Sequence, residues 1–459
     1  MSFQIERAVP TQVDAICAIE RNAVQMFRDH PAWPFYATLS IPPEMLQEAI
    51  QRGLVWVARV AESDDPVGFV WLDTEHGGDV IGIAEIDVLP AYSKRGIGAA
   101  LLQCACEWAR SAGYRRVDLG TLADVPWNAP FYAKHGFVVV DKRDPAFAYA
   151  RDRDRENGFP DALRVFMSRE LSAPAAHEWT VWPAPAKLNL FLRKLDVNED
   201  GHDEWQSVVR LLDWSDELRL RVRDDDQLCH RTGYGEKEHD VILRAAVLLR
   251  AHTGINIGAE IDIEPRIPRH VGLGDESSTA AAVLVALNHL WKCGLDQNEL
   301  AELGRTLGND VPLFVRGRAA WVTGAVDRFK SITLPKRWYV VLDSHANVSS
   351  DELFQATELT RIAAPATISS FASGETLENV FEPIVRERYP RVAAALDWLG
   401  SHGHARLSGS SGCVFLETAT PERAEAVARR CPAAFTAWVA EGVGVSPLHR
   451  ALSRHGATA

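Results

Sequence analysis

The chain is 459 residues long, with 47% hydrophobic and 24% charged residues and a formal net charge of −13. This length exceeds one ordinary domain, so we expect two or three, and the acidic balance argues against a nucleic-acid surface. The start has no apolar signal region and no stretch approaches a membrane span. The absence of such a stretch argues against membrane partners. The seven cysteines are odd in number and mostly isolated, which favours a reduced cytoplasmic protein.

The first elements alternate between strand and helix patterns. Apolar residues recur every three or four positions after Pro10, which predicts a helix, and period-two alternation predicts the strands. The aromatic, turn-rich segment 27–36 is predicted to be a loop, and its aromatic residues belong either to a pocket or to the core. The strands predicted in this part are 3–8, 54–60 and 67–72.

A basic glycine loop follows the next predicted strand, 81–88. It runs through Ser93, Lys94, Arg95, Gly96, Ile97 and Gly98 and leads into a predicted helix at 99–111. Helix amides and the helix dipole attract an anion, and glycines let it approach the backbone closely. The pattern predicts a pyrophosphate site, with a tight structural turn as the alternative.

A second motif, Trp127 to Phe137, lies between predicted strands at 116–119 and 138–140. Together, the basic loop and this motif resemble the GNAT acetyltransferase superfamily over 2–171. The resemblance implies a mixed twisted sheet with flanking helices, and acetyl-CoA as cofactor. It implies that Lys94 to Gly98 hold the pyrophosphate and that Ile86 and Val88 pair with the pantetheine arm. Asn128 would contact the cofactor, and Tyr132 would protonate the leaving thiolate.

One departure from that family is Ser93, which stands where a Gln or Arg is usual, although Lys94 and Arg95 keep the positive charge. Acetyl transfer to an amine also needs a base for the ammonium proton. Glu85 and Asp87 share a strand face, so either can serve, and the other is then a solvated surface carboxylate. We assign Glu85 to this role.

The joint between the two halves begins with a charge-dense segment, 142–157, which is predicted to be a hairpin excursion. A strand at 163–167 then closes the first domain. The expected boundaries are an acetyltransferase domain at 1–171, a linker at 172–178 and a second domain at 179–459.

The second half opens with an apolar strand at 181–193 that carries Lys187 and Asn189. These two side chains share a face, and a cation in a buried sheet needs a partner. A polar turn follows with His202 and Asp203. The later predicted elements are strands at 207–214, 217–222 and 255–263, helices at 241–252, 277–291 and 297–307, and a glycine- and serine-rich hairpin at 405–415.

A second glycine loop runs from Val271 into the helix predicted at 277–291. Gly272 and Gly274 allow a tight backbone, and Ser277 and Ser278 open the helix, which is the pattern of an anion cradle. Asp310 follows the next helix and is predicted at a helix-to-strand corner, where a carboxylate can reach a pocket.

These stretches resemble the GHMP small-molecule kinases over 179–452, and most of all the 4-diphosphocytidyl-2-C-methyl-D-erythritol kinases of isoprenoid precursor synthesis. The resemblance also rests on the Leu-Thr-Arg at 359–361. The resemblance implies a two-lobed fold and the phosphorylation of a small-molecule hydroxyl with ATP. Asp310 would take the hydroxyl proton and Lys187 would keep Asp310 ionised. The resemblance further implies contacts with ATP by Gly272, Gly274, Ser277 and Ser278, and contacts with the substrate by Asn189, His202 and Asp203.

Where the sequence departs from the pattern of this kinase family, the changed residues are those that would contact ligands. Asp275 and Glu276 replace two loop glycines, and a carboxylate about 4 Å from a phosphate oxygen costs roughly 4 kcal/mol at an effective dielectric of 20. Glu276 is then either a ligand for ATP-bound magnesium, or both carboxylates fill the anion site and this half is a non-catalytic binding module. His202 and Asp203 replace a Tyr-His pair. No metal ligands are assigned, and the acceptor amine and oligomeric state stay open.

Overall fold

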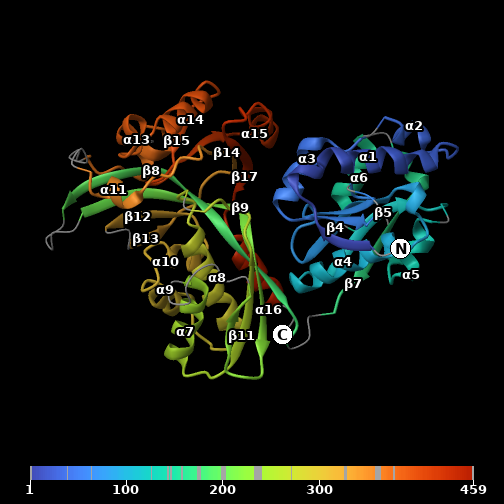
Figure 1. Cartoon of the computed structure of the whole chain (residues 1–459), viewed down its shortest axis with the longest axis horizontal. Helices are drawn as coiled ribbons and strands as arrows, with labels where there is room; N and C mark the ends of the chain where they lie inside the picture. Colours follow the sequence, from blue (N-terminus) through green and yellow to red (C-terminus); the bar gives the residue numbers. More distant parts are fainter. Residues whose placement is uncertain are drawn as a thin grey trace. The chain divides into compact units, whose positions relative to one another are not determined.

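The computed structural model describes residues 3–38, 40–61, 63, 65–125, 127–141, 144, 147–156, 159–172, 177–197, 203–231, 240–269, 271–324, 328–356, 363–375 and 378–456. The chain forms two compact units, Met1–Thr180 and Val181–Gly456 (Figure 1). His202 and the segment 359–361 lie outside the described residues. None of the described helices is long and apolar enough to cross a membrane.

The described part of the N-terminal unit contains a seven-stranded sheet in the order β1-β2-β3-β4-β5-β7-β6. β4 and β5 run parallel and their neighbours antiparallel, so the predicted mixed sheet is confirmed. The strands are β1 Phe3–Arg7, β2 Val55–Val60, β3 Gly68–Asp73, β4 Val80–Val88, β5 Arg116–Leu122, β6 Val138–Val139 and β7 Arg164–Glu170.

Helices cover both faces of this sheet, with α1 and α3 on one side and α4 on the other (Figure 1). The α-helices are α1 Val13–Ala23, α2 Trp33–Tyr36, α3 Pro43–Gln51, α4 Ile97–Ser111, α5 Ala129–Lys134 and α6 Ala148–Glu156. Short 3-10 turns lie at Pro10–Gln12, Val24–Phe27, Pro90–Tyr92 and Asp161–Leu163.

Two loop predictions in this unit were wrong. The segment predicted as a loop at 27–36 contains α2, and the predicted hairpin excursion contains α6. In α6 the alternating charges are spaced for a helix surface, where Arg155 pairs with Asp152 at 2.8 Å. Charge density alone does not distinguish a hairpin from a helix, whereas the three-residue spacing of opposite charges is the helical signal.

The described part of the C-terminal unit contains a ten-stranded sheet. Seven strands follow the order β10-β11-β9-β17-β14-β16-β15, with β8 and β12 also paired to β9 and β13 paired to β12. The strands are β8 Thr180–Val197, β9 Asp203–Arg223, β10 Leu228–His230, β11 Gly258–Glu264, β12 Ala320–Gly324, β13 Arg328–Ser331, β14 Arg337–Asp343, β15 Ala405–Leu407, β16 Cys413–Thr418 and β17 Thr436–Gly442.

The prediction of two strands at 207–214 and 217–222 was wrong, because both belong to the 21-residue strand β9. The polar residues between them do not form a turn. Asp216 instead accepts the backbone N–H groups of Arg266 and Ile267 at 2.6 and 2.7 Å, which ties β9 to the chain after β11. One carboxylate oxygen inside the strand is therefore bound by a distant segment.

The helices of this unit fix the glycine loop in place. The middle of α8 is buried along 278–287, and α8 packs against α7, α9, α10 and α16. Asp310 begins α10, so the predicted helix-to-strand corner is a helix-to-helix corner. The helices are α7 Val241–Thr253, α8 Asp275–Leu290, α9 Gln297–Gly304, α10 Val311–Arg316, α11 Ser350–Phe354, α12 Ile368–Ala372, α13 Glu382–Arg388, α14 Pro390–Gly400, α15 Pro421–Ala428 and α16 Pro447–Gly456.

Candidate functional site

The basic loop of the N-terminal unit ends in a left-handed residue at the start of α4. Gly96 has φ +84° and precedes the first helical turn, and no side chain caps that end of the helix. A Cβ on Gly98 would lie 3.8 Å from both Val88 Cγ2 and Phe131 Cζ. The start of α4 therefore lies beside β4 and α5, and its free amides, together with the charges of Lys94 and Arg95, have the properties that attract an anion.

Tyr132 lies on α5, one helical turn after Asn128, whose carbonyl accepts the Tyr132 N–H at 3.1 Å. Its ring packs against Phe137 with 5.9 Å between centroids. Burial raises the pKa of Tyr132, and the charges of Glu85 and Asp87 raise it further. The structure thus brings Tyr132 together with both candidate carboxylates on β4.

A third carboxylate, Glu20 on α1, joins this group and was missed in the sequence. Its side chain is buried, and its Oε2 has no hydrogen-bond partner among the described residues. Burial raises the pKa of Asp87 well above its usual range, and Glu85 and then Glu20 add to that shift. The sequence does hold a signal for Glu20, because this residue lies four positions after buried Ile16, on the apolar face of α1.

The aromatic segment before β2 belongs partly to the core and partly to this site. Phe35 packs edge-on against Phe159 with centroids 4.6 Å apart, and Phe27 stacks on Tyr36 at 5.1 Å. Burial raises the pKa of Tyr36 to about 12, and Glu85 contributes to the rise against the opposing charge of Arg164. Tyr36 therefore connects the aromatic cluster with the carboxylates.

In the C-terminal unit, Lys187 and Asp310 form an ion pair with 3.6 Å between Nζ and Oδ2. Lys187 is buried in β8, whereas the Asp310 side chain is 28% exposed at the start of α10. Lys187 also donates to Asn189 Oδ1 at 2.5 Å, and Asn189 Nδ2 donates to Ser207 Oγ at 2.9 Å. The Lys187 ammonium is therefore bound by the buried Asn189, and the Asp310 carboxylate is partly open to solvent.

The glycine loop beside this pair is fixed by backbone and packing. Gly272 and Gly274 have φ values of +80° and +81°, and a Cβ would lie 2.1 Å from Ser411 Oγ or 2.6 Å from Phe314 Cζ. The carbonyl of Leu273 accepts the backbone N–H of Lys187 at 2.9 Å. The loop therefore holds Lys187 at the uncapped start of α8.

The two serines of the loop have different surroundings. Ser278 is buried and its hydroxyl donates to the carbonyl of Pro185 at 2.7 Å. Ser277 is half-buried, and its Oγ lies 3.3 Å from where a Cβ on Gly308 would stand, two residues before Asp310. Ser278 thus supports the loop, and Ser277 lies at the corner that presents Asp310.

The two loop carboxylates, Asp275 and Glu276, have different surroundings. Asp275 is buried, and its Oδ2 lies 3.9 Å from Nη1 of Arg269, which also lies 3.9 Å from Asp216. Glu276 is exposed at the start of α8. The charge of Asp275 is therefore compensated by Arg269, a partner that the sequence analysis missed, and only Glu276 is open to solvent.

The predicted substrate residues are spread along β8 and β9. Asn189 lies within the Lys187 network, and Asp203 Oδ1 pairs with Lys194 Nζ at 2.8 Å. Lys194 is seven residues beyond Lys187 on the same strand, which corresponds to roughly 23 Å of extended chain. Asp310 and Asp203 therefore pair with lysines at two well-separated positions of β8.

Comparisons with known families agree with the fold of both units. Residues 24–137 match the acetyltransferase (GNAT) family, residues 240–318 the N-terminal domain of the GHMP kinases and residues 353–437 their C-terminal domain. The fold and sites thus define a GNAT acetyltransferase domain followed by a GHMP kinase domain, as the sequence predicted.

Relatives of known name narrow the family assignment of the C-terminal unit. 4-diphosphocytidyl-2-C-methyl-D-erythritol kinase of Xanthomonas axonopodis pv. citri is 47% identical over 275 residues, 59% of this chain and 93% of the relative. The enzyme of that name from Halorhodospira halophila is 45% identical over 281 residues, 60% and 97%. A crystal structure of 4-(cytidine 5'-diphospho)-2C-methyl-D-erythritol kinase is 31% identical with a TM-score of 0.51, covering 58% of this chain and 100% of that one. Through Val181–Gly456, the chain belongs to the 4-diphosphocytidyl-2-C-methyl-D-erythritol kinase family.

Proposed function

We propose that the chain carries two activities. The C-terminal unit transfers the γ-phosphoryl group of ATP to a hydroxyl of 4-diphosphocytidyl-2-C-methyl-D-erythritol, and the N-terminal unit transfers acetyl from acetyl-CoA to an amine. The observation that carries the kinase assignment is the Lys187–Asp310 pair beside the glycine loop. The separation of Lys187 and Lys194 along β8 suits an elongated substrate with its nucleobase near Asp203.

In phosphoryl transfer, Asp310 accepts the proton of the attacking hydroxyl. Lys187, whose Nζ lies 3.6 Å from Asp310 Oδ2, compensates the negative charge that develops on the substrate oxygen. The amides at the start of α8, with Gly272 and Gly274, bind the phosphates. The compensated charge of Asp275 removes one of the two repulsions that the loop sequence suggests.

Magnesium fits this site only together with the nucleotide. The described residues contain no group of three His, Cys, Asp or Glu side chains that could hold a metal alone. Magnesium is usually bound by one or two carboxylates and by substrate phosphates, whose charge it neutralises. Glu276 and Ser277 are the groups that would hold it.

Glu276→Gln is therefore expected to weaken ATP binding by about ten-fold in the presence of magnesium, since a charged ligand is lost. Without magnesium, the same change should leave ATP binding equal or slightly tighter, because a repulsive charge is removed. Calorimetry with and without magnesium measures both. Glu302→Gln, an exposed carboxylate on α9, is the matched control.

The opposite result has a definite meaning. Tighter ATP binding by Glu276→Gln under both conditions would show that the loop carboxylate only repels phosphate. That result would support the alternative of a non-catalytic module.

For acetyl transfer, we propose that the Glu85–Asp87 pair takes the proton of the incoming ammonium. The neutral amine then attacks the acetyl carbonyl, the C–S bond breaks, and Tyr132 protonates the leaving thiolate. The second nitrogen proton, released as the amide forms, restores the proton that the Tyr132 hydroxyl gave up. Each carboxylate charge raises the pKa of Tyr132. Protonation of the carboxylate by the substrate therefore makes Tyr132 a better acid when the thiolate leaves.

The three carboxylates also indicate what kind of amine accepts the acetyl group. Glu20, Glu85 and Asp87 gather negative charge in a half-buried place, which favours a cationic amine. We further propose that the protein works in the reducing cytoplasm, because all seven cysteines are free.

Gly96→Val is expected to abolish measurable acetyl-CoA binding. A β-branched residue strains at φ +84°, and its side chain occupies the space that a pyrophosphate needs above the α4 amides. Gly77→Val is the matched control, since Gly77 also has a positive φ of +71° in open surroundings. Calorimetry with acetyl-CoA tests both variants, and unchanged binding by Gly96→Val would refute the loop assignment.

A further inference from the structure

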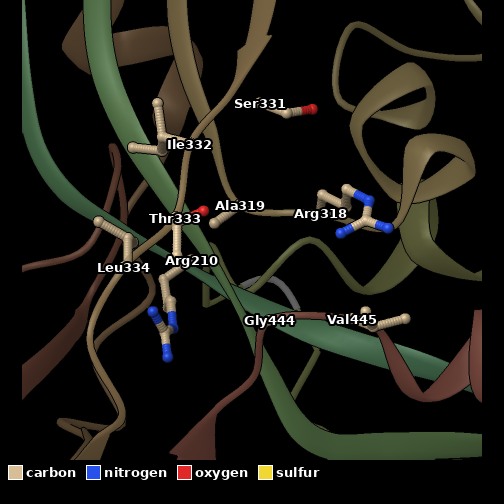
Figure 2. A pocket seen from close by; sticks show the side chains of 9 residues that line it. All are labelled: Arg210, Arg318, Ala319, Ser331, Ile332, Thr333, Leu334, Gly444 and Val445. Carbon is tan, nitrogen blue, oxygen red and sulfur yellow. The ribbon is translucent and has the colours of Figure 1, made fainter.

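A pocket of about 230 Å³ lies in the C-terminal unit, away from the glycine loop. Its walls come from β9, the turn after α10, the segment after β13 and the loop after β17. In Figure 2, Arg318 lies on the side opposite Ile332 and Leu334. Arg210 lines the other side, and no acidic residue lines the pocket.

Arg210 is the unusual member of this lining. Its side chain is 1% exposed, and Nη2 donates to the carbonyl of Gly442. Its Nε and Nη1 have no hydrogen-bond partner within the described part of the chain. Buried polar groups are nearly always hydrogen-bonded, and a buried charge left short of partners is costly. Burial accordingly lowers the pKa of Arg210.

The position of Arg210 on β9 explains the missing partners. Val209 pairs with Ala320 of β12, and Leu212 pairs with Gly442 of β17. Arg210 lies where the strand passes from one neighbour to the other. The exchange of neighbours leaves a gap in the sheet, and the pocket occupies that gap.

Nearby carboxylates do not remove the positive charge. Glu417 and Glu441 act on Arg210 from a distance. Glu417, however, accepts from Arg406 at 3.1 Å and Arg337 at 3.3 Å, and Glu441 pairs with Lys336 at 3.0 Å. Arg318 is exposed and forms no ion pair among the described residues. The surroundings of the pocket therefore keep an excess of cations.

We propose that this pocket binds a small phosphate monoester with a short aliphatic tail. Guanidinium groups bind phosphate through paired, charge-assisted hydrogen bonds. Exposed Arg318 is the group that contacts the anion, and buried Arg210, whose Nε and Nη1 lack partners among the described residues, adds positive charge to the opposite side of the pocket. Ile332, Leu334 and Val445 give the pocket an apolar wall that suits a few methylene groups. The site shares no residue with the glycine loop or the Lys187–Asp310 pair, so it is independent of the proposed activities.

Monobutyl phosphate, titrated into the full chain by calorimetry, tests the proposal. Binding is expected, and Arg318→Ala should weaken it by about ten-fold or more, because an exposed charge is lost without disturbing the core. Arg430→Ala removes a similarly exposed arginine elsewhere in the unit and should change nothing. Binding should persist at saturating ATP and magnesium.

Four outcomes would overturn the proposal. They are an absence of binding, equal binding by Arg318→Ala, displacement by ATP, which would place the anion at the glycine loop, and equal affinity for inorganic phosphate, which would exclude a role for the apolar wall. Arg210→Met should also lose binding while keeping the melting temperature of a folded unit. If that variant does not fold, Arg318→Ala alone decides.

Discussion

Asp310→Asn is expected to lower kcat for phosphoryl transfer by about 10²–10⁴-fold, the usual effect of removing a general base. The amide cannot accept the hydroxyl proton, although its shape preserves the start of α10. ATP affinity should be nearly unchanged, because the glycine loop and the start of α8 bind the phosphates. Steady-state kinetics with 4-diphosphocytidyl-2-C-methyl-D-erythritol, together with ATP calorimetry, measure both quantities.

The alternative is that Lys187 and Asp310 form only a structural ion pair. Asp310→Asn would then lower the melting temperature, since buried Lys187 loses its partner, but leave kcat as in the wild type. Asp397→Asn is the matched control, because this exposed carboxylate pairs with Arg386 at 2.7 Å on the surface. A wild-type chain that binds ATP but never turns over would contradict the kinase proposal itself.

Tyr132→Phe is expected to lower kcat for acetyl transfer by about 10²-fold while leaving the Kd for acetyl-CoA nearly constant. Only the hydroxyl that protonates the thiolate is lost, and the ring keeps its packing against Phe137. Release of free thiol from acetyl-CoA in the presence of cationic amines measures the rate. Tyr114→Phe, beside Trp108 at the other end of α4, is the matched control.

The pH profile of the wild type supplies the second readout. As pH rises through the raised pKa of Asp87, the carboxyl loses its proton and can accept that of the ammonium, so kcat/KM rises. This rising limb should lie above the range of an ordinary carboxyl. Tyr132→Phe should lower the whole profile without moving the limb. An unaltered rate would assign the protonation of the thiolate to another group, such as water.

The sequence predicted the parts of this molecule that depend on local pattern. Gly96 before α4 and Gly274 before α8 are recognisable because a helix start and a positive φ leave a mark within a few residues. Asp310 was expected at a corner, but the short helix α10 after it carries too few residues for a periodic signal.

The remaining features depend on contacts between distant segments. Glu20 reaches the site only because α1 packs over β4, and Arg269 compensates Asp275 only in the folded loop. Asp216 resembled a turn residue because its partners, the amides of Arg266 and Ile267, lie fifty residues away. Composition and period cannot show such partners.

The continuity of β9 has a consequence for how the C-terminal unit unfolds. The strand pairs with β11 along Glu217–Arg223 and with β12 along Trp205–Val209, and it touches β17 at Leu212. β9 therefore joins β11, which lies in the segment that matches the N-terminal GHMP domain, to β17, which begins at the end of the segment that matches the C-terminal domain. Neither half can lose its part of the sheet without stripping hydrogen bonds from the other. We expect the two halves to melt as a single cooperative unit, with the amides of β9 among the slowest to exchange their hydrogens.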